Sequence, residues 1–88
     1  MLKVIKRDCT EDDFDKVKIE KAILKAMKTG NGVKEKIALD IAEEIYEENK
    51  DKEEIEISKI ENLVSDELIT KKQRLTAKSY EGYRNVIS

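Results

Sequence analysis

The spacing of apolar residues changes along the chain, and the first stretch is typical of a β-hairpin. Residues 2–7 contain apolar and β-branched residues, namely Leu2, Val4 and Ile5, which predicts a short strand, and residues 11–14 are predicted to form the return strand. Residues 8–10, Asp-Cys-Thr, lie between them as the turn. Because an isolated hairpin is only marginally stable in water, we expect this one to rest on the remainder of the fold.

From residue 15 the apolar spacing becomes that of an amphipathic helix. Asp15 is the predicted N-cap, because its carboxylate can accept hydrogen bonds from the first amides of the helix. Gly30-Asn31-Gly32 is predicted to end the helix, since glycine readily adopts the left-handed conformation found beyond helix ends. The apolar face consists of Val17, Ile19, Ala22, Ile23, Ala26 and Met27.

A second helix is predicted from residue 33 and is expected to fray at residues 49–52. Its apolar stripe consists of Val33, Ile37, Ala38, Ile41, Ala42, Ile45 and Tyr46. The acidic residues on its other side are Glu43, Glu44, Glu47 and Glu48. We expect them to form a solvated face and not a metal site. Residues 53–57 alternate between acidic and apolar, which predicts a third short strand added to the edge of the hairpin.

Two further helices are predicted in the last third of the chain. Ser58 and Glu61 have the spacing of a capping box, which predicts a helix start at Ser58. Residues 71–73 are expected to connect this helix to the last one. The apolar residues of the third helix are Ile60, Leu63, Val64 and Leu68, and the fourth helix carries Ala77, Tyr80, Tyr83, Arg84 and Ile87 at helical spacing.

The predicted order is β-β-α-α-β-α-α, which is an α+β fold: a four-helix bundle capped by a small three-stranded sheet. With 88 residues, the chain has room for one small domain, residues 1–88. Charged residues make up 43% and hydrophobic residues 39%, so the core must be built mainly from Ile, Leu, Val and Ala. A core of this size is close to the limit of independent stability, and we expect it to depend on a ligand, a partner or a parent chain.

Composition excludes several classes of function. The net charge of −2 gives no overall basic excess for nucleic acid, and no apolar run is long enough to cross a membrane. The first 15 residues lack the apolar stretch of a secretory signal, so we expect a cytoplasmic protein. The chain has no His, one Cys and no phosphate-loop or dinucleotide motif, and we therefore expect a domain without catalytic residues of its own.

The cations near the hairpin admit two readings. Lys6 and Arg7 end an apolar strand, and Lys18 lies in the first turn of the next helix, where a cation is favoured only if an anion is nearby. A helix start with Lys and Arg can hold phosphates. The alternative, favoured on spacing alone, is a surface network in which the three cations neutralise Asp8, Asp12, Asp13 and Asp15. Neighbouring strand residues point to opposite faces, so Lys6 and Arg7 face one ligand only if the strand twists or bulges.

Both ends of the sequence carry motifs of a known family. The segment Val4-Ile5-Lys6-Arg7-Asp8 and the later Phe14-Asp15-x-x-Lys18-Ile19 with Ala22-Ile23 are similar to the start of the ATP-cone domain. The segment Ala77-x-x-Tyr80-x-x-Tyr83-Arg84 is similar to its closing motif, and the I-x-x-L-V segment from Ile60 to Val64 also fits. The resemblance covers essentially all 88 residues.

The resemblance implies a regulatory domain that binds ATP or dATP as an effector, with Mg²⁺ accompanying the phosphates, under a lid formed by the sheet. Lys6 and Arg7 match the cations that contact the nucleotide, and Lys18 matches the lysine near the phosphates. Asp15 and Ile19 would border the site, and Ile57 would belong to the adenine pocket. The implied partners are the adenine nucleotide, the catalytic domain of a ribonucleotide reductase and further copies of the chain.

Similar domains occur on aerobic and anaerobic ribonucleotide reductases and on a zinc-ribbon repressor of reductase genes. The Val-Ile-Lys-Arg-Asp start and the Lys/Glu-rich helices are most similar to the anaerobic ribonucleoside-triphosphate reductase. We expect a regulatory domain cut from a larger enzyme, or a free-standing cone. The alternatives are a helical interaction domain that has lost its ligand and the nucleotide-sensing half of a repressor; balanced charge and missing zinc-ribbon cysteines disfavour the latter.

Four residues depart from the family pattern or have two possible roles. Cys9 stands where the family usually has Gly, which would cost about 1 kcal/mol if the turn keeps its left-handed residue. As a thiol it is expected to be an ordinary reduced surface residue, with crosslinking of two copies as the alternative. Tyr80 and Tyr83 are expected in the core, with lining of the adenine as the alternative; Arg84 would pair with a glutamate or a phosphate.

Overall fold

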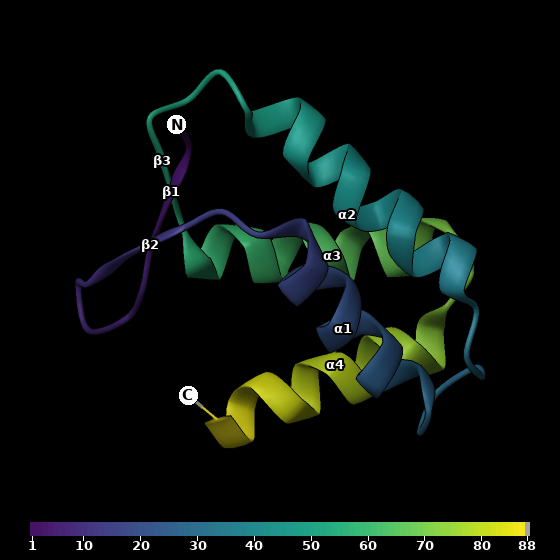
Figure 1. Ribbon diagram of the computed structural model, residues 1–88. Helices are drawn as coiled ribbons and strands as arrows, with labels where there is room; N and C mark the ends of the chain where they lie inside the picture. Colours follow the sequence, from purple (N-terminus) through teal and green to yellow (C-terminus); the bar gives the residue numbers. More distant parts are fainter. Residues whose placement is uncertain (88) are drawn as a thin grey trace.

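The computed structural model describes the backbone of residues 1–87 and the side chains of residues 1–82, and in this part a three-stranded sheet lies at one end of four helices (Figure 1). This confirms the predicted α+β class and the order of the elements. The strands are β1 (Lys3–Ile5), β2 (Glu11–Asp13) and β3 (Glu54–Glu56). The helices are α1 (Lys16–Met27), α2 (Glu35–Asn49), α3 (Ile57–Thr70) and α4 (Arg74–Ile87).

The four helices form a closed ring around one core. Helix α1 packs against α2 and α4, and α3 packs against the same two neighbours from the other side. Each helix therefore buries its apolar stripe against two others, which is how an amphipathic helix gains most of its stability. Among the described residues, the largest fully buried side chains are Ile23, Met27, Ile41, Ile45, Val64, Leu68 and Thr76.

The sheet is mixed, with β1 in the middle. Strand β1 pairs antiparallel with β2 and parallel with β3, and Val4 lies opposite both Asp12 and Ile55. Because partners in register point to the same face, these three side chains share one face of the sheet. Val4 and Ile55 are buried, so this is the face that covers the helices.

The hairpin turn keeps a left-handed residue at the position of Cys9, whose φ is 68°. The amide of Cys9 donates to the carbonyl of Lys6 at 2.9 Å, and the amide of Lys6 donates to the carbonyl of Thr10 at 2.9 Å. This is the geometry of a three-residue hairpin loop, in which a turn is followed by one residue at positive φ. The expected strain at Cys9 is therefore present in this backbone.

Both ends of α1 are held by side chains, and the predicted N-cap is confirmed. Asp15 has an extended backbone, and its Oδ1 accepts a hydrogen bond from the amide of Val17 at 2.9 Å. Beyond the other end, the amide of Asn31 donates to Thr76 Oγ1 at 3.0 Å, and Asn31 Oδ1 accepts from the amide of Thr76 at 3.1 Å. The α1–α2 connection is thus fastened to the start of α4.

Several local predictions were wrong in detail. The capping box is absent: α3 begins at Ile57 directly after β3, its N-cap is Glu56, and no side chain bonds to the first turn. Ser58 is therefore inside the helix, where its hydroxyl cannot act as the N-cap. Ile57 was predicted in the third strand and is instead the first helical residue. Helix α2 starts at Glu35, and Val33, expected on its buried stripe, precedes the helix and is 52% exposed.

The acidic side of α2 is not uniformly solvated. Glu44 is half-buried, and its Oε1 accepts a hydrogen bond from Lys71 Nζ at 3.2 Å where α3 ends. Lys16 Nζ approaches Glu43 Oε1 at 3.2 Å, and Lys50 Nζ approaches Glu47 Oε2 at 2.7 Å. The carboxylates of α2 therefore take part in ion pairs between elements as well as facing water.

Candidate functional site

A pocket of about 280 Å³ lies between the sheet and the first turns of α1 and α3. Its apolar residues come from all of these elements and are Val4, Phe14, Ile19, Ile57 and Ile60. Its charged residues are Lys6, Asp12, Asp13, Asp15 and Lys18. A cavity with an apolar lining and a few convergent polar groups has the usual character of a small-molecule site, at the small end of the range.

Strand alternation explains why the pocket is apolar at one end and charged at the other. Residues 2, 4 and 6 point to the same face of the sheet, and they are Leu2, Val4 and Lys6. Leu2 and Val4 are buried against the helices, whereas Lys6 lies beyond the end of β1 at the rim. The same face therefore carries an apolar patch that ends in a cation.

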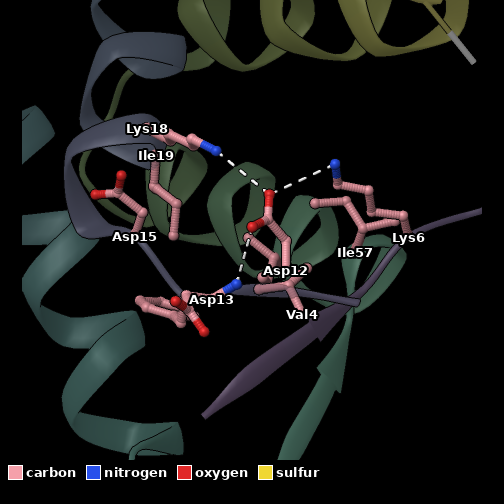
Figure 2. Close-up of a pocket in the computed structure, with 10 residues that line it drawn as sticks. Val4, Lys6, Asp12, Asp13, Asp15, Lys18, Ile19 and Ile57 are labelled. Carbon is pink, nitrogen blue, oxygen red and sulfur yellow. Dashed lines mark hydrogen bonds and ion pairs between the residues drawn. The ribbon is translucent and has the colours of Figure 1, made fainter. Parts of the chain in front are cut away.

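Asp12 lies between the two lysines of the pocket. Its Oδ2 is 3.5 Å from Lys6 Nζ and 3.4 Å from Lys18 Nζ, and Figure 2 shows both side chains reaching toward this one oxygen. The other carboxylate oxygen, Oδ1, accepts a hydrogen bond from the amide of Asp13 at 3.0 Å. The hydrogen bond from Lys18, the amide of Asp13 and the charge of Lys6 lower the pKa of Asp12 below its ordinary value.

The structure brings five of the six predicted site residues to this pocket. Lys6, Asp15, Lys18, Ile19 and Ile57 line it, although the Asp15 carboxylate is engaged as the N-cap of α1. The sixth, Arg7, is not among its lining residues. Sequence reasoning placed Asp12 in a surface network and did not single it out as part of the site; the pairing of Val4 with Asp12 is the structural feature that puts it there.

Arg7 points to a different partner. Its guanidinium nitrogen Nη2 forms an ion pair with Oε1 of Glu61, which lies on α3 and is nearly buried. Consecutive residues Lys6 and Arg7 thus serve different parts of the molecule, as expected for neighbours at the end of a strand. Lys6 and Lys18 both pair with Asp12, as the surface network predicted for that residue, whereas Arg7 pairs with Glu61 and with none of the predicted aspartates.

The lining of the pocket suits an anionic ligand with an apolar part. The described residues contain no group of His, Cys, Asp or Glu arranged to hold a metal ion. The cations are lysines that already hold a carboxylate, so a negatively charged group is known to fit between them. The donor set therefore suits phosphate oxygens, with the apolar lining available to a flat ring.

Phe14 and Tyr80 lie in different environments. Phe14 lines the pocket and also contacts Tyr46 of α2, with ring centroids 5.6 Å apart. Tyr80 is buried in the helical core, which confirms the core interpretation of that residue. The side chains of Tyr83 and Arg84 lie outside the described residues.

Comparisons with known proteins agree with this arrangement. The family model described as "ATP cone domain" matches residues 2–86, which is nearly the whole chain. No curated protein matches the sequence. Within residues 1–87, none of the helices has the length and apolar character needed to cross a membrane.

Proposed function

Because the chain belongs to the ATP-cone family, whose members are nucleotide-binding regulatory modules, we propose that it binds ATP or dATP at the pocket beneath the sheet and thereby controls the overall activity of a ribonucleotide reductase. The family domain is regulatory and not catalytic. The chemistry of reduction would therefore belong to a separate catalytic domain, which is the proposed partner of this module.

The observation that carries the proposal is the convergence of Lys6 and Lys18 on one anionic position at the mouth of an apolar pocket. In the proposed complex the adenine lies against Ile19 and Ile57, and the phosphates extend to the two lysines. Lysine is a common phosphate ligand, and each Lys–phosphate contact is strengthened because both partners are charged. Mg²⁺ bound to the phosphates would neutralise part of their charge.

Effector binding would connect the hairpin, which is only marginally stable by itself, to the helical bundle. The pocket is formed jointly by the sheet, α1 and α3, so a molecule bound there contacts all three. A ligand that binds only the closed arrangement stabilises it by mass action. To act as a switch, ATP and dATP must differ in their affinity for two states of the module, and they differ chemically only at the 2′-hydroxyl.

The proposed parent is an anaerobic ribonucleoside-triphosphate reductase, on the similarity of the Val4–Asp8 segment and the Lys/Glu-rich helices. In such a chain the module would alter the assembly or order of the catalytic domain, and contact between further copies of the module is one way to do so. A reductase assay tests this part: Lys18→Ala in the parent enzyme should remove the response of turnover to ATP and dATP. An unchanged response would contradict it.

Nucleotide binding itself is tested by thermal unfolding of the isolated chain with ATP, dATP and GTP. At a hundredfold excess over Kd, a ligand that binds only the folded state should raise Tm by roughly 10 °C. Lys6→Ala and Lys18→Ala should abolish the shift without unfolding the free protein. Lys36→Ala is the control, because Lys36 lies on α2 and pairs with Asp40 away from the pocket. No shift with any purine nucleotide would instead favour a ligand-free interaction domain.

A further inference from the structure

We propose that Asp12 is an internal competitor of the effector's phosphates, an inference that rests on the proposed function of the pocket. Its carboxylate occupies the anionic position between Lys6 and Lys18, so the phosphates must displace it or bind beside it. Asp12 would thereby set how much nucleotide is needed to switch the module.

The placement of Asp12 follows from the sheet register. It lies opposite Val4, and Val4 lies opposite Ile55 on the other side. Both neighbours in this row are buried and apolar, so the alternation would favour an apolar residue at position 12 as well. An acidic residue at this point puts a negative charge on the inner face of the sheet, within ion-pair distance of both lysines (Figure 2).

The carboxylate is held in this position from two sides. Oδ2 is shared by the two ammonium groups, while Oδ1 accepts the hydrogen bond from the amide of Asp13. The depressed pKa of Asp12 means that the group is charged at neutral pH. The lysines therefore have a charged partner before any ligand arrives.

A phosphate entering the pocket meets this carboxylate directly. Two negative groups at ion-pair distance repel each other, and the repulsion is stronger beside a partly buried pocket than in open water. If the carboxylate leaves, two ion pairs are lost; if it stays, the repulsion remains. Either outcome lowers the affinity for phosphates and leaves the affinity for the adenine part unchanged.

The position of Asp12 on an edge strand allows it to move. The strand order is β2-β1-β3, so β2 has a hydrogen-bonded neighbour on one side only. A small outward shift of β2 can withdraw the carboxylate while Lys6 stays at the end of β1 and Lys18 stays on α1. Displacement of Asp12 is thus a means by which phosphate binding can be coupled to a change in the sheet.

The test compares Asp12→Asn with Glu11→Gln by isothermal titration calorimetry at fixed ionic strength. Both substitutions remove one negative charge from β2, but Glu11 is on the outer face of the sheet and pairs with Ile5. We expect Asp12→Asn to bind ATP roughly tenfold more tightly than the wild type, since two exposed ion pairs worth a few-fold each no longer compete. Glu11→Gln should change the affinity by less than about threefold, because the Glu11 side chain is exposed on the outer face of the sheet, where water and salt screen its charge.

The gain should depend on the number of phosphates. Asp12→Asn is expected to increase affinity most for ATP, less for AMP and not for adenosine, whereas a general loosening of the fold would affect all three alike. Circular dichroism of each variant checks that the chain is folded. Equal ATP affinity in wild type and Asp12→Asn would overturn the proposal. So would weaker binding of the Mg²⁺–ATP complex by the variant, because it would make Asp12 a helper of the bound metal.

Tripolyphosphate separates this proposal from the proposed function. If no variant binds ATP but Asp12→Asn binds tripolyphosphate more tightly than the wild type does, the nucleotide assignment fails and the role of Asp12 stands. If the wild type binds ATP and Asp12→Asn gains nothing, the role of Asp12 fails and the nucleotide assignment stands. If no variant binds either ligand, both are wrong.

Discussion

Arg7 in the hairpin turn and Glu61 on α3 form an ion pair although they are 54 residues apart in the chain. The Glu61 side chain is 11% exposed and that of Arg7 44% exposed, so the pair lies at the boundary between solvent and core. It fastens the tip of the hairpin to the bundle at a point outside the pocket.

We expect Arg7→Ala to loosen the hairpin and to leave the helices intact. The loss should be about 1 kcal/mol, more than for a fully exposed pair because Glu61 is nearly buried. Hydrogen exchange measures it locally: the Lys6 amide, bonded to the Thr10 carbonyl, should exchange faster, while amides in the middle of α3 should not. Lys36→Ala, which breaks an exposed i,i+4 pair, is the control. Equal protection of Lys6 in both variants would contradict the assignment.

Cys9→Gly should stabilise the protein. Cys9 has φ 68°, and a side chain at positive φ costs about 1 kcal/mol that glycine does not incur. For a domain of this size the gain corresponds to a rise in Tm of roughly 4–8 °C. Cys9→Ala should give no gain, because alanine keeps the Cβ. A rise in Tm of the same size for both would show that the thiol and not the backbone is responsible.

The same reasoning applies at the end of α3, where Lys72 has φ 64°. The amide of Gln73 donates to the carbonyl of Leu68 at 2.7 Å and that of Lys72 to Ile69 at 3.0 Å, which is a Schellman motif with a lysine in the glycine position. Lys72→Gly should therefore add to the effect of Cys9→Gly, since the two sites are at different places in the fold.

Gly30→Ala should destabilise the protein strongly. A Cβ at residue 30 would lie 2.5 Å from Thr76 Cα and 2.6 Å from Thr76 N, and these backbone atoms are fixed by the hydrogen bonds between Asn31 and Thr76. We expect a loss of about 2–3 kcal/mol in the free energy of unfolding, measured by urea denaturation. The control is Gly82→Ala on α4, where nothing lies within 4 Å; there, alanine should add about 0.5–1 kcal/mol.

The elements of the fold could be predicted from the sequence because each depends on local information. The apolar periodicity identified the helices, and Asp15 was recognisable as an N-cap from its position before the first helical turn. The capping box at Ser58 was wrong because β3 runs directly into α3, so the N-cap is Glu56, two residues earlier than predicted. The position of the β3–α3 junction is set by the pairing of β3 with β1. Because β1 lies far from β3 in the sequence, the residues around Ser58 alone do not reveal this pairing.

Only the part of the candidate site that depends on local sequence could be predicted. Lys6 and Lys18, which line the pocket, were singled out by their residue type and by family motifs that span a few positions, and their nucleotide contacts stay predictions. The location of Asp12 between them depends on which residue of β2 lies opposite Val4, and one step of register would turn its side chain to the outer face. The partner of Arg7 is 54 residues away, so no local pattern could reveal it. The nucleotide contact expected of Arg7 stays a prediction.

A pH-dependent effect is expected where α2 meets the end of α3. A hydrogen bond with Glu44, burial and the charge of Glu44 raise the pKa of Glu67 above its ordinary 4.5. The same hydrogen bond, and that from Lys71 Nζ at 3.2 Å, lower the pKa of Glu44. The pKa of Glu67 is higher in the folded protein than in the unfolded chain. The contribution of Glu67 to stability is therefore present at low pH and is lost as the pH rises through the folded pKa.

Glu67→Gln should therefore stabilise the protein at pH 7 by about 0.5 kcal/mol, because glutamine gives a donor toward Glu44 and removes the like charge, while only the long 3.7 Å ion pair with Lys71 is lost. The advantage should shrink toward zero as the pH falls below 4.5, where Glu67 of the wild type carries its own proton. Urea denaturation of both proteins across this range measures the difference. Asp66→Asn, the same charge change at an exposed neighbouring position on α3, should show no such pH dependence. If the difference in unfolding free energy between Glu67→Gln and wild type does not vary with pH, Glu44 does not raise the pKa of Glu67.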